Sequence, residues 1–213
     1  MRAVLIANAK GGVGKTMIAV TLASALASAL AARGGRVALA DADRQGSALR
    51  WLAARPGSAV RVEPLDWTRG KAIGDAPKGL DWLVIDAPGA IRGDKAGSLV
   101  REAHRIVTPL TPSMFDLRAT EAFVETIEAL KRVRKGKAMV HVVANRVRRG
   151  KAADALLASL TAAEQPPVAV LSDRSAYGEL AGRGLSVFDR NLAALDGIRS
   201  EWAPLIAAIR ASE

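Results

Sequence analysis

The fold is decided by residues 8–16, which read Asn8-Ala9-Lys10-Gly11-Gly12-Val13-Gly14-Lys15-Thr16. A short apolar run leads into this stretch, and a long Ala/Leu-rich helical pattern follows it. Glycines let the backbone curl so that its N–H groups face a polyphosphate, and the start of the following helix adds partial positive charge there. The stretch therefore predicts a phosphate-binding loop between a strand and a helix.

Two residues at the end of this loop carry the chemistry of nucleotide binding. Lys15 is expected to reach the β- and γ-phosphates, and the Thr16 hydroxyl is expected to hold magnesium. Against the pattern Gly-x-x-x-x-Gly-Lys-Ser/Thr, the stretch has Ala9 at the first glycine and adds Lys10. ATP and Mg²⁺ are the expected cofactors, and the nucleotide-contacting residues are predicted to be Lys10, Gly11, Gly12, Val13, Gly14, Lys15, Thr16 and Met17.

Short apolar runs alternate with helical patterns along the rest of the chain. Buried strands are predicted at Ala3–Ala7, Val37–Ala40, Leu83–Ile85, Ile106–Leu110, Val140–Ala144 and Val168–Leu171, with a further strand at Ala59–Glu63. Helices are predicted at Lys15–Arg33, Gly46–Ala54, Ala96–Ala103, Thr120–Arg134, Lys151–Ala163 and Leu192–Ala211. Continuous apolar strands are typical of a parallel sheet covered on both faces. The sequence thus predicts one domain over residues 1–213, a three-layer α/β/α fold with a mainly parallel twisted sheet.

Composition narrows the chemistry and the location. The chain has no cysteine, which excludes disulfides, cysteine metal sites and iron–sulfur clusters. Its two histidines, His104 and His141, are expected to be packed structural residues rather than metal ligands. No signal-peptide pattern is visible, and the apolar stretch 17–32 is shorter than the ~20 residues of a spanning helix. A cytoplasmic location is expected.

Acidic residues follow two of the predicted strands. The strand Val37–Ala40 leads into Asp41 and Asp43, and strand alternation sends both side chains to the same side of the sheet edge. Carboxylates beside a magnesium triphosphate can orient the water around the metal and the attacking water. A helix N-cap for the segment that starts at Gly46 is the alternative role for Asp43. The strand Leu83–Ile85 ends in Asp86 at the same edge.

The loop variant with two lysines resembles the deviant Walker A motif of the ParA/MinD family of ATPases. The resemblance implies that Lys10 crosses a dimer interface, so that two ATP molecules lie between two subunits, and that Lys10 and Lys15 are catalytic. The segment 41–45 is similar to the family's Asp-x-Asp-Pro-Gln motif, although Arg44 stands at the proline position. By that match, Asp43 positions the hydrolytic water.

The same resemblance implies the metal site and the adenine side. Magnesium is expected at Thr16, Asp41 and Asp86, the last through water, in a segment similar to Walker B. Three later segments also look like the family's, although ordinary loop chemistry is an alternative for each: residues 108–116, Asn145 at the end of a strand, and residues 171–189. From the last two, Asn145, Ser172 and Arg174 are expected to face the adenine.

Basic residues give the chain a formal net charge of +10, from 31 Lys and Arg against 21 Asp and Glu. Residues 131–151 hold nine of the cations and no acid. Such a cluster is typical of a nucleic-acid partner. The strand Val140–Ala144 divides the cluster, so the group at 131–137 is expected at the opposite edge of the sheet from the second group. The second group lies near the nucleotide edge and is the preferred DNA-binding set: Arg146, Arg148, Arg149 and Lys151.

The resemblance covers residues 1 to 190 and is closest to the small single-domain ParA type. It implies an ATPase of weak intrinsic activity, stimulated by a ParB-like or cargo adaptor protein. It also implies a homodimer that binds nonspecific DNA over the nucleoid in the ATP state and is released on hydrolysis. Its role would be to segregate a plasmid or chromosome, or to space a cargo such as carboxysomes or chemoreceptor clusters.

Two other functions stay open at this point. A MinD-like membrane-associated positioning ATPase would need a C-terminal amphipathic helix, and apolar residues do recur there: Ile198, Trp202, Leu205, Ile206 and Ile209. No Lys/Arg-rich face accompanies this stripe, which favours packing on the domain. A metabolic phosphate-loop enzyme is disfavoured because no further catalytic constellation is visible.

Overall fold

The computed structural model describes residues 1–69, 75–89, 93–162 and 166–211. Within them, seven strands form one sheet in the order β3-β2-β4-β1-β5-β6-β7, and every neighbouring pair is parallel. The strands are β1 Arg2–Ile6, β2 Val37–Asp41, β3 Glu63–Asp66, β4 Trp82–Asp86, β5 Arg105–Leu110, β6 Met139–Val147 and β7 Ala169–Ser172.

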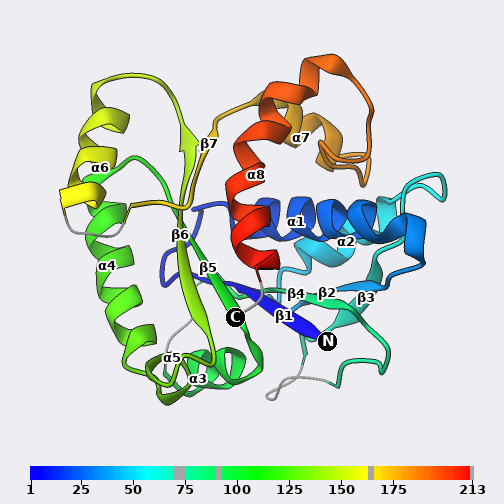
Figure 1. Ribbon diagram of the computed structural model, residues 1–213, viewed down its shortest axis with the longest axis horizontal. Helices are drawn as coiled ribbons and strands as arrows, with labels where there is room; N and C mark the ends of the chain where they lie inside the picture. The colour runs from blue at the N-terminus through cyan, green and yellow to red at the C-terminus, as the bar shows by residue number, and fades with distance from the viewer. Residues whose placement is uncertain (70–74, 90–92, 163–165, 212–213) are drawn as a thin grey trace.

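Helices cover both faces of this sheet (Figure 1). They are α1 Lys15–Leu30, α2 Ser47–Ala54, α3 Gly93–Glu102, α4 Met114–Glu128, α5 Lys131–Arg134, α6 Lys151–Ala162, α7 Ser175–Ala181 and α8 Asp196–Arg210, with 3₁₀ turns η1 Ala31–Arg33 and η2 Ala193–Leu195. Alternate residues of β1 divide the core: Val4 and Ile6 pack with α1, α2 and α8, whereas Ala3 and Leu5 pack with α3 and α4. The predicted three-layer α/β/α fold is confirmed.

Helix α1 is the central helix of one layer. Its apolar and small side chains are buried on nearly every side, Ile18, Leu22 and Leu26 among them. By length and composition alone, residues 15–33 could cross a membrane, but 67% of that stretch is buried inside the fold. A helix that is apolar all round can equally be the core of a soluble domain. Gly34, at φ 66°, ends the helical segment.

Helix α8 lies on the same layer and packs along β7 and α1 (Figure 1). Its apolar stripe faces inward: Trp202, Leu205 and Ile209 are almost fully buried in the core that α1 and the sheet form. The indole N–H of Trp202 donates to the Tyr177 hydroxyl oxygen at 2.9 Å, which ties α8 to α7. The prediction that this stripe packs on the domain is confirmed.

Several predicted boundaries are wrong. The strand predicted at Ala59–Glu63 lies instead at Glu63–Asp66, because the Val60 carbonyl accepts hydrogen bonds from the Arg55 guanidinium rather than from a strand. The helix predicted at Thr120–Arg134 begins at Met114 and is broken, since Leu130 has an extended conformation between α4 and α5. Helix α7 was not predicted as a helix, and α3 begins three residues before the predicted start.

The register of the central strands brings the polar segments to one place. Strand β4 lies between β2 and β1, and its last residue, Asp86, is level with Asp41 of β2 and Ile6 of β1. Because the strands are parallel, the loop that follows β1 and both acids meet at the carboxyl edge of the sheet. Ligands of open α/β sheets bind at this edge.

Candidate nucleotide-binding site

The loop between β1 and α1 has the backbone that its glycines allow. Gly12 and Gly14 have positive φ values of 79° and 90°, which few other residues adopt, and Gly14 caps the start of α1. A methyl group added at Gly14 would lie 2.4 Å from Asn145 Nδ2. Glycine is therefore required at position 14 both by backbone conformation and by the close approach of β6.

Asn8 anchors the entrance of this loop. Its buried side-chain amide donates to the Pro109 carbonyl at 2.7 Å and to the Thr120 hydroxyl at 2.9 Å, and its Oδ1 accepts from the Lys10 N–H at 3.0 Å. These bonds tie the loop to β5 and α4. Asn8 was absent from the predicted site residues, although a polar residue directly after an apolar strand was the signal that could have found it.

Lys15 lies at the base of the loop with only 6% of its surface exposed. Its ammonium donates to the carbonyls of Lys10 and Gly89, at 2.7 and 2.9 Å. Burial lowers the pKa of Lys15, and the nearby carboxyls of Asp86 and Asp43 work against that shift. Lys15 is thus a buried cation held by main-chain oxygens at the base of the loop.

Asp86 is the acid that is left without hydrogen bonds. It is 1% exposed. Among the described residues, neither of its carboxylate oxygens makes a hydrogen bond of full geometry. The Thr16 hydroxyl is nevertheless close enough to favour the ionised form. Burial raises the pKa of Asp86 to about 7. A buried carboxylate with free oxygens beside a threonine hydroxyl fits Mg²⁺, which takes one or two protein oxygens and keeps several waters.

Asp41 has a different environment, although it sits level with Asp86. Its Oδ1 accepts from the Asp43 N–H at 3.1 Å, and its Oδ2 accepts from the Leu49 N–H at 3.0 Å. Burial raises the pKa of Asp41, and these main-chain bonds oppose the shift. The carboxylate therefore holds the start of α2 in place. A magnesium role for Asp41 stays a prediction, and the geometry favours Asp86.

Asp43 reaches across the site to the segment after β4. Its Oδ2 accepts from the Gly89 N–H at 3.0 Å, and its Oδ1 accepts from the Gln45 N–H at 3.0 Å. The Gly89 residue is thus held on both sides, by Asp43 at its N–H and by Lys15 at its carbonyl. Residues 90–92, which continue this segment, lie outside the described residues.

The three predicted adenine contacts divide into two places. Asn145 points into the loop, where its Nδ2 donates to the Val13 carbonyl at 2.8 Å. Ser172 instead bonds to Glu201 of α8, through both its N–H and its hydroxyl at 2.8 Å. Arg174 Nε donates to the Ser172 hydroxyl at 2.9 Å. Ser172 and Arg174 line a cleft of about 530 Å³ with Val147, Arg148, Arg149, Val170, Asp173 and Glu201.

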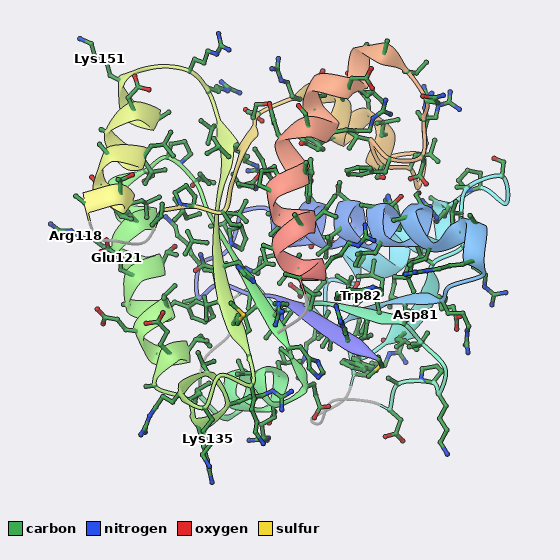
Figure 2. The ribbon with its side chains drawn as sticks, viewed as in Figure 1. Asp81, Trp82, Arg118, Glu121, Lys135 and Lys151 are labelled. Carbon is green, nitrogen blue, oxygen red and sulfur yellow. The ribbon has the colours of Figure 1, made fainter. Side chains whose placement is uncertain are left out.

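The basic residues after β6 also have separate partners. Arg146 Nη1 donates to the Gly12 carbonyl at 3.2 Å, whereas Arg148 pairs with Asp173 at 2.6 Å, with most of its side chain exposed. Arg149 is exposed, and so is Lys151 at the start of α6. Figure 2 shows Lys151 and Lys135 at opposite ends of the molecule. The prediction that the two basic groups lie at opposite edges of the sheet is confirmed.

The sequence profile of the CobQ/CobB/MinD/ParA nucleotide binding domain matches residues 4–187. This chain belongs to that family. The match covers the phosphate loop, the three acids and β6, so the nucleotide-binding family and the geometry of the sheet edge agree.

Known members of the CobQ/CobB/MinD/ParA family resemble the chain to different degrees. The Maintenance of carboxysome distribution protein A of Gloeobacter kilaueensis is 36% identical over 128 residues, which are 59% of this chain and 55% of that relative. The matched part thus spans little more than half of the relative's length.

Two solved structures share the fold over nearly the whole chain. Apo McdA from Cyanothece has a TM-score of 0.73 at 17% identity and covers 99% of this chain and 100% of its own. A plasmid partition protein of Borrelia burgdorferi bound to AMPPNP has a TM-score of 0.69 at 16% identity, covering 98% and 97%. At these identities, the likeness concerns the fold alone.

The buried Asp86 carboxylate gives a prediction for the stability of this protein in the absence of nucleotide. At pH 8, above its pKa of about 7, the wild-type carboxylate is ionised and buried, and neither of its oxygens makes a hydrogen bond of full geometry within the described residues. Asp86→Asn keeps the shape and removes the charge, so we expect the free energy of unfolding in EDTA to rise by about 1–3 kcal/mol. The gain should shrink toward pH 5, where the folded wild-type protein binds a proton at this site.

Urea unfolding followed by circular dichroism measures this change. The exposed Glu179 provides the control, because Glu179→Gln removes the same charge from the surface and should change the free energy of unfolding by about 0.5 kcal/mol or less. A less stable Asp86→Asn protein at pH 8 would show that stabilisation of the charge by Lys15 and Thr16 outweighs the cost of burying it.

Proposed function

We propose that this chain is an ATP-dependent positioning ATPase that binds ATP with Mg²⁺ and dimerises around two nucleotides. In the ATP state the homodimer binds DNA without sequence preference, and hydrolysis, stimulated by a ParB-like or cargo adaptor protein, releases it. The carboxysome-distribution relative supports a cellular cargo carried over the nucleoid, and the plasmid partition structure supports a DNA cargo as the other form of the same function.

The observation that carries this proposal is the double-lysine loop. The main chain of Lys10 makes the contacts that shape the loop: its N–H donates to Asn8, and its carbonyl accepts from Lys15. The main-chain groups of Lys10 therefore help to shape the turn. A second, half-exposed cation at the mouth of a phosphate loop suits the phosphates of a nucleotide bound to a facing subunit.

The site residues support hydrolysis by positioning and charge. Lys15 would exchange the carbonyls of Lys10 and Gly89 for phosphate oxygens, while the loop N–H groups face the same phosphates. Thr16 and Asp86 would hold magnesium, which neutralises phosphate charge. Asp43 would orient the attacking water, and its present bond to the Gly89 N–H would then break. Occupation of the site is thus expected to move the segment after β4.

The MinD-like alternative depends on a helix that can leave the domain and enter lipid. The apolar residues of α8 are instead covered by the core, with Trp202 and Leu205 at 0% exposure. Glu201 on the same helix accepts hydrogen bonds from Ser172 of β7. Releasing α8 would expose this core and break these bonds. The packing of α8 therefore supports DNA rather than a membrane as the partner of this protein.

ATP-dependent DNA binding tests the proposal. With ATP and Mg²⁺ the protein should bind duplex DNA of any sequence, and ADP should weaken the binding. Each phosphate contact contributes a slope of about −0.9 to log affinity against log salt, so binding should fall steeply from ~50 to ~200 mM salt. Lys10→Ala should still bind ATP but lose both the dimer, measured by light scattering, and DNA binding, measured by fluorescence anisotropy.

Charge-matched variants locate the DNA surface. The double variant Arg148→Ala/Arg149→Ala should weaken binding equally for all sequences, and Arg134→Ala/Lys135→Ala, with the same charge change at the opposite edge, should not. Weakening by the second pair alone would move the DNA surface to residues 131–137. Recovery of the protein with anionic liposomes but not with DNA would instead support the membrane-associated alternative.

A further inference from the structure

Strand β6 contains an irregularity directly beside the phosphate loop. Ala144 is level with Val170 of β7 and Val147 is level with Ser172, so two residues of β6, Asn145 and Arg146, face one residue of β7. Arg146 has a φ of 54° and is the non-glycine residue with positive φ in the described part of the chain. Extra residues of this kind redirect side chains and are frequent next to active sites.

The irregularity turns two consecutive side chains to the same target. In a regular strand, successive side chains point to opposite faces of the sheet. Here the Asn145 amide donates to the Val13 carbonyl at 2.8 Å, and Arg146 Nη1 donates to the Gly12 carbonyl at 3.2 Å. In a regular strand, the Arg146 guanidinium would point away from the loop. The unusual backbone at Arg146 instead brings the guanidinium into contact with the loop.

These two bonds affect the N–H groups of the loop. In a trans peptide, the C=O and the N–H point in opposite directions. Holding the carbonyls of Gly12 and Val13 toward β6 thus directs the N–H groups of Val13 and Gly14 away from β6, toward the side where the loop receives phosphate. The guanidinium also places a fixed positive charge against the loop, with donors left for further contacts.

We propose that Arg146 is a positioning residue of the nucleotide site, which orients the loop for phosphate, rather than a DNA-binding residue. This inference rests on the proposed ATP binding. It separates Arg146 from Arg148 and Arg149, which line the neighbouring cleft, where Arg148 donates to Asp173 rather than to the loop.

The test compares Arg146→Gly with the wild-type protein by calorimetric titration of ATP with Mg²⁺. Glycine adopts positive φ without strain, so this variant is expected to keep the backbone of β6 while it removes the whole Arg146 side chain, guanidinium included. We expect the Kd for ATP to rise about tenfold, with the melting temperature of the nucleotide-free protein unchanged or higher. In steady-state hydrolysis, KM should rise and kcat at saturating ATP should stay within about twofold.

Two further variants sharpen the result. Arg146→Lys keeps a cation that can donate to the Gly12 carbonyl and should bind ATP within about threefold of the wild type. Arg118→Ala removes the same charge from the exposed surface of α4 (Figure 2) and should leave the Kd unchanged.

Three results would overturn the inference. It fails if Arg146→Gly binds ATP within twofold of the wild type, or if its melting temperature falls in step with its affinity, since Arg146 would then serve only the fold. It fails together with the proposed function if the wild-type protein itself does not bind ATP.

Discussion

Asp189→Ala is expected to lower the free energy of unfolding by about 3–5 kcal/mol, because it leaves a buried guanidinium without its counter-charge. Arg55 Nη2 and Asp189 Oδ1 are 2.5 Å apart, and the side chains are 6% and 0% exposed. The Asp189 carboxylate also accepts from the Ser24 hydroxyl at 2.8 Å and from the Ser186 N–H at 2.7 Å. The network joins α1, the end of α2 and the segment before α8.

The expected loss can be separated from ordinary surface effects by urea unfolding. Asp196→Ala removes an exposed partner of Arg199 and should change the free energy of unfolding by about 1 kcal/mol or less. The double variant Arg55→Met/Asp189→Leu should recover much of the loss, because it leaves no unpaired buried charge. A loss below about 1 kcal/mol for Asp189→Ala would show that the pair contributes little.

The same pair gives the protein a pH dependence of known sign. Burial alone would raise the pKa of Asp189, but hydrogen bonds from Arg55, Ser24 and Ser186 outweigh it and hold the pKa below its ordinary value. A carboxyl group whose pKa is lowered by folding stabilises the folded protein at any pH above its unfolded-state pKa, which is about 4. This stabilisation is lost as the pH falls through the lower folded-state pKa. Asp189→Ala should therefore flatten the acid side of the stability profile.

Lys15→Ala is expected to weaken ATP binding by about 100-fold or more, since it removes the buried cation that we propose binds the phosphates. The domain should remain folded, because the ammonium is bonded only to the Lys10 and Gly89 carbonyls in the described structure and its burial already lowers its pKa. Calorimetric titration measures the affinity, and circular dichroism checks the fold.

A surface lysine is the control for this loss. Lys135→Ala removes the same charge from an exposed position after α5 and should leave the affinity unchanged. ATP binding by folded Lys15→Ala within tenfold of the wild type would mean that the nucleotide is held elsewhere.

The layers of the fold could be predicted because the strands are continuous apolar runs of the kind that a doubly covered parallel sheet requires. The position of the edge strand β3 could not be predicted in this way. β3 is only four residues long, contains Pro64 and alternates between half-buried and exposed side chains. Arg55, which is held by Asp189 from far along the chain, donates to the Val60 carbonyl in the segment where the strand was expected. Local pattern cannot show such a contact.

The sequence by itself determined which residues meet at the site, because the carboxyl ends of parallel strands lie at one edge: the loop after β1, Asp41 and Asp43 after β2, and Asp86 at the end of β4. Tertiary structure alone decided what each can do there. Asp41 accepts hydrogen bonds from N–H groups of its own loop and of α2, whereas neither Asp86 oxygen accepts a hydrogen bond of full geometry in the described structure. Arg146 reaches the loop because one extra residue in β6 reverses the direction of its side chain. These differences depend on distances between segments far apart in the chain, which residue type and spacing do not encode.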